Sequence, residues 1–138
     1  MRFKLVVAGL SALAVSACSA PMTFQGPMNA AYEVPPTNSR GVGTIVATVY
    51  PTTRAMTYTA EYKDLTGPAT GAHFHGPAAP GANAPVVVPS VVTPNTIKGG
   101  ATLTEAQFAD LQAGKWYYNI HTAANPGGEI RGQVQRVQ

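Results

Sequence analysis

Charged residues and cysteine are both scarce in this sequence of 138 residues. Asp, Glu, Lys and Arg make up 11% of the chain, well under the usual quarter, which argues against a disordered polyelectrolyte and against a charged coiled coil. Because Cys18 is the only cysteine, the chain can form neither an intramolecular disulfide nor a zinc site built from several cysteines. Only three histidines are present, so few residues can carry chemistry.

The remaining composition favours one strand-rich domain. Hydrophobic residues account for 45% of the chain, and its 14 glycines and 12 prolines together make up about a fifth. That is more glycine and proline than a helical bundle tolerates, but the apolar content suffices for a packed core. The length suits a single domain.

The first residues have the features of an export signal. Arg2 and Lys4 precede an apolar run over residues 5–15, and small residues lead to Cys18. A positive start, a short apolar stretch and small residues before a cleavage point are typical of secretory signals, and the run is too short to span a bilayer. Residues 15–18, Val-Ser-Ala-Cys, resemble the lipobox of bacterial lipoproteins, which implies lipidation of Cys18. An ordinary secretory signal with a coincidental cysteine is the alternative.

These features predict the organisation and the location of the chain. We expect a lipoprotein signal peptide over 1–17, a lipidated tether over 18–26 and a single domain over 27–138. The mature protein would be extracytoplasmic and held to a membrane by lipid at Cys18, in the periplasm, on the outer membrane or on the cell surface.

The charge of the mature chain argues against nucleic acid as a partner. Without the two leader cations, seven basic and six acidic residues remain, so the net charge is about +1. No cluster of Lys or Arg occurs in the mature sequence, and nucleic-acid binding therefore loses its main support. The expected partner is the membrane, through the lipid, and a protein or envelope partner stays open.

Alternation of apolar and polar residues predicts an antiparallel all-β fold. Residues 55–62 and 115–121 show this period of two most clearly. Further strands are expected over 41–50, 71–75, 86–92, 97–103 and 129–137. Turn residues every eight to 12 positions favour a β-sandwich.

One short helix is expected over about 104–113. Thr104 and Gln107 have the spacing of a capping box, in which each side chain bonds the other residue's backbone N–H. Gly114 supplies a stop.

All three histidines fall in two short motifs at predicted strand ends. His73 and His75 lie two apart, so both point to one face of a strand, with their Cα atoms about 6.5–7 Å apart. His121 ends another strand, on the face opposite its core residues. Neutral imidazoles with an open fourth position suit copper or zinc, and a domain without a thiol cannot form a blue-copper site. An extracytoplasmic location favours copper, with zinc as the alternative; in a metal-free alternative, each histidine is an exposed strand-end residue or bonds a backbone carbonyl.

Three neighbouring side chains are candidates to hydrogen-bond and orient the ligands. Asn119 shares the face of His121, two residues before it. Glu129 and Arg131 are also two apart, so on one strand they would share a face, where they could pair, orient His121 or present Arg131 to an anion. The alternative is a pair that fixes the neighbouring turn. Glu33, before two prolines, is interpreted as a turn carboxylate.

Four ordered motifs resemble the CHRD domain, a module named from chordin and also found in bacterial secreted proteins. They are Tyr32-Glu33-Val34-Pro35-Pro36, Gly71-Ala72-His73-Phe74-His75-Gly76-Pro77, Tyr118-Asn119-Ile120-His121-Thr122 and Pro126-Gly127-Gly128-Glu129-Ile130-Arg131-Gly132. The resemblance implies an immunoglobulin-like β-sandwich or barrel with distant similarity to copper–zinc superoxide dismutases, and it makes the three histidines candidate copper ligands. The chain has no bridging histidine, no separate zinc ligands and no cysteine pair, so full two-metal dismutase activity is not expected.

Three functions follow from these observations. The first is metal buffering or delivery by an anchored, extracytoplasmic protein. The second is a structural or interaction module of the cell envelope without metal. The third is a small copper-dependent redox enzyme. No catalytic residue is assigned.

Overall fold

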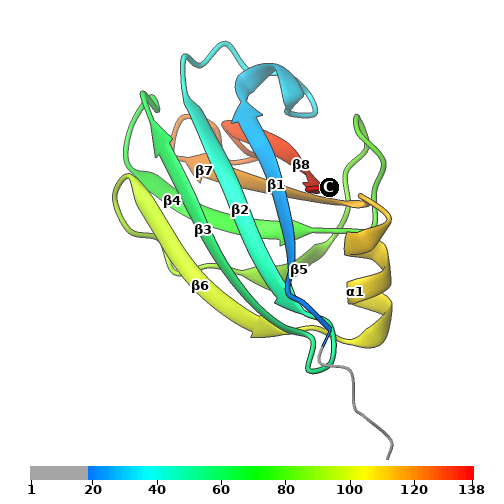
Figure 1. The fold of residues 1–138 in the computed structure, drawn as a ribbon. Coiled ribbons are helices and arrows are strands. Elements are labelled where there is room, and N and C mark those ends of the chain that lie inside the picture. The colour runs from blue at the N-terminus through cyan, green and yellow to red at the C-terminus, as the bar shows by residue number, and fades with distance from the viewer. Residues whose placement is uncertain (1–18) are drawn as a thin grey trace, which may run out of the picture.

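The computed structural model describes residues 19–138, which form one antiparallel sheet that curls into a nearly closed barrel (Figure 1). The predicted signal peptide and Cys18 lie outside the described residues. The strand order is β5-β4-β7-β8-β1-β2-β3-β6. The strands are β1 (Met22–Asn29), β2 (Val42–Tyr50), β3 (Ala55–Lys63), β4 (Ala69–His75), β5 (Val86–Pro89), β6 (Thr96–Thr102), β7 (Trp116–Thr122) and β8 (Ile130–Arg136). An all-β fold with one short helix is therefore confirmed.

The first strand corrects the predicted tether. Residues 18–26 were expected to lead into the domain, but β1 begins at Met22 and pairs with both β2 and β8. Its inward residues Phe24 and Met28 are buried in the core. Gly26 between them has no side chain, because its backbone lies against the carbonyl of Gln133. A glycine inside the strand hides the alternation on which the prediction of strands depends.

Helix α1 (Glu105–Gln112) connects β6 to β7 and begins as predicted. The Thr104 hydroxyl accepts from the Gln107 backbone N–H, and the Gln107 side chain accepts from the Thr104 backbone N–H. Gly114 follows with φ +69°, the left-handed conformation that favours glycine after a helix. A 3₁₀ turn, η1 (Ala30–Tyr32), follows β1. Between residues 19 and 138, no helix has the length and hydropathy to cross a membrane.

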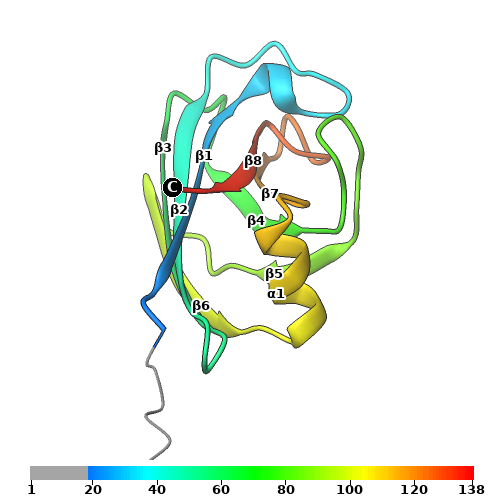
Figure 2. The same cartoon turned by 45° about the vertical axis from the view of Figure 1, so that its right-hand side comes forward.

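The core fills the space between the two sides of the curled sheet, β1, β2, β3 and β6 on one side and β4, β5 and β7 on the other (Figure 2). Strand β2 contributes Ile45, Ala47 and Val49, which are fully buried, and β7 contributes Trp116 and Tyr118. The other face of β7 is also largely buried. The connection from β4 to β5 covers part of that outer face, and the candidate site lies there.

Candidate metal centre

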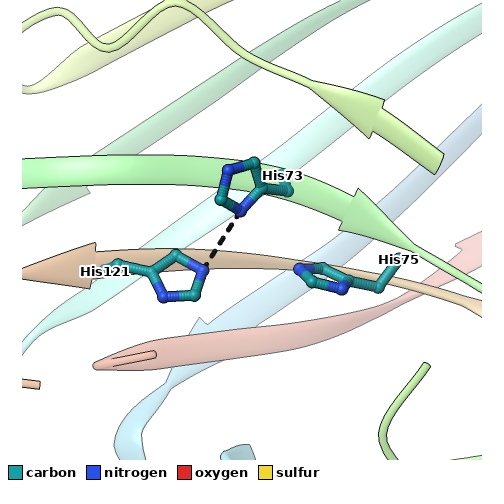
Figure 3. A group of neighbouring side chains, drawn as sticks. All are labelled: His73, His75 and His121. Carbon is teal, nitrogen blue, oxygen red and sulfur yellow. Dashed lines mark hydrogen bonds between the residues drawn. The ribbon is translucent and has the colours of Figure 1, made fainter. Parts of the chain in front are cut away.

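The three histidines lie together on the outer face of two paired strands (Figure 3). Strand β4 carries His73 and His75, and its neighbour β7 carries His121. The antiparallel register sets Gly71 opposite His121 and His73 opposite Asn119, so His121 is a diagonal neighbour of His73. His73 Nδ1 lies 3.2 Å from His121 Nε2. One ring nitrogen from each histidine lies within 4.8 Å of the others, so the group could hold a metal ion.

Backbone carbonyls fix which nitrogens of two imidazoles are free. His75 Nδ1 lies 2.9 Å from the carbonyl oxygen of Ala84, and His121 Nδ1 lies 2.9 Å from that of Pro126. A carbonyl oxygen only accepts, so each Nδ1 carries the proton and donates it. In the neutral rings Nε2 therefore has a free lone pair. This arrangement is typical of metal-binding histidines, whose second nitrogen donates to a carbonyl or carboxylate.

Asn119 lies against the Nε2 atoms of His75 and His121. Its Oδ1 lies 3.0 Å from His75 Nε2 and 3.0 Å from His121 Nε2. Three acceptor atoms thus face one another when the rings are neutral. Bound cations or protons are what make such a cluster favourable, because a cation is attracted to every acceptor at once.

Burial keeps the rings of His73 and His75 in the neutral form, which binds metal. Burial is the largest cause that lowers the pKa of His73, and the neighbouring imidazoles of His121 and His75 lower it further. Burial is also the largest cause that lowers the pKa of His75, against the oxygens of Ala84 and Asn119, which raise it because they accept hydrogen bonds from the protonated ring. A base with a lowered pKa is neutral at neutral pH, which leaves its lone pair available.

Arg131 stabilises the surroundings of His75 rather than orienting His121. Its guanidinium carbon lies 3.3 Å from the centre of the Tyr117 ring, and this ring stacks on the His75 imidazole with centroids 4.7 Å apart. Nη1 donates to Asn83 Oδ1 at 3.0 Å, and Nη2 donates to the Ala82 carbonyl at 2.6 Å. Arg131 is 1% exposed. It therefore holds the segment whose Ala84 carbonyl bonds His75.

Glu129 does not contact a histidine, and it does not pair with Arg131. Strand β8 begins at Ile130, so Glu129 lies in the preceding turn. Residues two apart share a face only within a strand, so Glu129 and Arg131 need not point the same way. Its carboxylate accepts hydrogen bonds from side chains or backbone of Ser39, Thr66, Thr122 and Asn125. The alternative prediction, a Glu129–Arg131 pair that fixes the turn, is not what the structure has: Glu129 alone ties the turn before β8 to these four residues.

Glu33 is a site residue whose environment the sequence did not reveal. It is 4% exposed, and burial raises its pKa to about 7 even though Arg131, the Val34 backbone and Asn119 lower it. Within the described part of the chain, its Oε1 finds no hydrogen-bond partner. Only the folding of the β1–β2 connection over the β7–β8 turn brings Glu33 to the site. No local pattern encodes that contact; the two prolines after it signal only a turn.

Comparison with known proteins identifies the family. A model of the CHRD domain matches residues 24–134, a range that includes the three histidines and the whole of strands β4 and β7. No curated protein and no solved structure matches the chain. Since the matched range covers most of the chain, the protein belongs to the CHRD domain family.

Proposed function

We propose that this protein binds one transition metal ion, copper in preference to zinc, through His73, His75 and His121, and that it buffers or delivers the ion outside the cytoplasm. The observation that carries the proposal is the convergence of three imidazole nitrogens, each within 4.8 Å of the others. Two of the rings have their other nitrogen committed to a carbonyl, which fixes their orientation before any ion arrives.

Ligand chemistry supports copper or zinc. Imidazole suits both ions, whereas a thiolate site would be needed to favour softer ions strongly. For a given set of nitrogen ligands, Cu²⁺ binds more tightly than Zn²⁺ in the order of divalent ions. The only cysteine of the chain, Cys18, precedes the domain and is the proposed lipid attachment point.

Solvent access favours exchange of the ion over permanent burial. His73 and His121 are half-buried, whereas His75 is 9% exposed. An ion can thus approach from the side of His73 and His121 while His75 holds it from the covered side. A buffering or delivery role requires this reversible access.

The test of the metal site is the stoichiometry of the purified full-length protein. After incubation with Cu²⁺ or Zn²⁺ and removal of loose ions, we expect one ion per chain by elemental analysis, and none in a His73→Ala, His75→Ala, His121→Ala variant. A Thr44→Ala, Thr57→Ala, Thr102→Ala variant, altered at three exposed strand residues, should bind like the unaltered protein. Equal metal content in the histidine variant would overturn the proposal and favour a metal-free envelope module.

The test of the lipid anchor is independent of the metal. We propose that Cys18 carries a lipid, which would hold the protein to a membrane. Cys18→Ser should move the exported protein from the membrane fraction to the soluble fraction, measured by immunoblotting after fractionation. Retention of the variant on the membrane would argue for an ordinary secretory signal and a different means of attachment.

A further inference from the structure

We propose that the side-chain oxygen of Asn119 is a fourth metal ligand, so that the site offers three nitrogens and one oxygen. This inference rests on the proposed metal-binding function and deepens it. It assigns a direct role to a residue that the sequence placed only beside the ligands.

The distances fit atoms that share one ion. Ligand atoms 2.0–2.1 Å from a metal and about 90–110° apart lie about 2.8–3.4 Å from each other. Asn119 Oδ1 lies 3.0 Å from both His75 Nε2 and His121 Nε2. His73 Nδ1 and His121 Nε2 lie 3.2 Å apart. All three distances are those of adjacent ligands around a small cation.

The positions of the imidazole protons also support a metal ion bound by Asn119. The Nδ1 protons of His75 and His121 are committed to the carbonyls of Ala84 and Pro126. The neutral rings therefore present lone pairs to the Asn119 oxygen, which is also an acceptor. Hydrogen bonds cannot form between these atoms, but a cation placed among them attracts all of them.

Neighbouring groups orient the amide so that its oxygen faces the rings. The Asn119 amide nitrogen lies on the opposite side of the side chain. There, both this nitrogen and the Glu33 carboxyl occupy the space that a Cβ on Gly128 would need. The Asn119 side chain lowers the pKa of Glu33, which is the effect that an NH₂ group has when it donates to a carboxylate. Gly128 has φ +128° and no space for a Cβ, so the turn accommodates this packing. Asn119 is 3% exposed and lies within β7, so its position is fixed by the sheet.

A harder oxygen donor changes which ion the site prefers. Carbonyl oxygens suit hard and borderline divalent ions, whereas Cu⁺ favours soft sulfur ligands. The oxygen should therefore strengthen binding of Zn²⁺ and Cu²⁺ more than binding of Cu⁺.

The experiment compares two substitutions with a matched control in the full-length protein. Asn119→Leu keeps the size of the side chain and removes the oxygen; Asn119→Asp keeps an oxygen and removes the NH₂. Gln135→Leu is the control, because Gln135 is an exposed amide side chain on β8. Dissociation constants for Zn²⁺, Cu²⁺ and Cu⁺ come from competition with chelators of known affinity.

We expect Asn119→Leu to weaken Zn²⁺ and Cu²⁺ binding by about 10–100-fold, with a smaller loss for Cu⁺. Asn119→Asp should bind Zn²⁺ at least as tightly as the unaltered protein, and Gln135→Leu should not change affinity. Unchanged affinity in Asn119→Leu, or equal losses in the Leu and Asp variants, would overturn the inference, since the second result means that the NH₂ group is what matters.

A measurement on the unaltered protein covers the case in which variants fail to fold. In Co²⁺-loaded protein with ¹⁵N-labelled asparagine, an Asn119 amide bound through oxygen gives contact-shifted NH₂ resonances. Their absence would overturn the inference while metal binding by the histidines stands. If the unaltered protein bound no metal, the proposed function itself would fall.

Discussion

Replacing Glu129 with glutamine should destabilise the fold by about 3 kcal/mol or more. The Glu129 carboxylate is fully buried and accepts five hydrogen bonds from four residues. One oxygen accepts from the Ser39 hydroxyl and the Thr66 backbone N–H, and the other accepts from Thr66, Thr122 and Asn125 side chains. A glutamine NH₂ in place of either oxygen faces at least two donors. Each hydrogen bond to a charged group contributes about 1.5–3 kcal/mol.

Denaturant unfolding at neutral pH measures this loss. Glu61→Gln is the matched control, since Glu61 is exposed on β3 and its substitution should change stability by less than about 0.5 kcal/mol. An equal, small effect in both variants would contradict the assigned role of Glu129.

The Glu129 carboxylate also makes the free energy of unfolding depend on pH in the acidic range. Burial alone raises the pKa of Glu129, but hydrogen bonds from three hydroxyls and one backbone N–H outweigh it and lower the pKa to about 2. The folded state thus holds the proton less tightly than the unfolded state does, so the stabilisation is complete above about pH 4.5 and is lost as the pH falls toward 2. The difference in stability between the unaltered protein and Glu129→Gln should narrow over that range.

The sequence pattern was sufficient to predict those features of the structure that depend on a single strand or helix. The alternation in residues 55–62 predicted β3, and the capping box at Thr104 predicted the start of α1. The spacing of His73 and His75 put both rings on one face because side chains alternate in any strand. None of these conclusions needed knowledge of which strands are neighbours.

Contacts between distant segments were not predictable in this way. Glycine at position 26 concealed β1, since its closeness to β8 shows only after the strands pair. Val86–Pro89 is shorter than the expected 86–92, because Pro89 has no N–H with which to continue the ladder. The Ala84 carbonyl that orients His75 is contributed by the β4–β5 connection, whose position depends on Arg131 of β8.

Replacing Arg131 with methionine should reduce both the stability of the fold and the affinity for metal. The buried guanidinium makes contacts that stabilise the fold and also holds the segment that orients His75. The guanidinium lies over Tyr117, a contact worth about 2 kcal/mol when desolvated, and it makes two charged hydrogen bonds to residues 82 and 83. Methionine fills much of the same apolar space but makes neither interaction, so the expected loss of stability is about 3 kcal/mol.

The loss of metal affinity follows from the position of Ala84. Without Arg131, residues 82 and 83 are no longer tied to β8, and the carbonyl that fixes the His75 ring moves more freely. Loss of such an orienting contact lowers metal affinity by about 10–100-fold, which competition with a chelator for Zn²⁺ measures. Arg136→Met, on the same strand but exposed, should change neither quantity. A protein that lost stability at Arg131 but kept its affinity for Zn²⁺ would show that the β4–β5 connection does not orient His75. In that case β4 and β7 alone would position the three histidines.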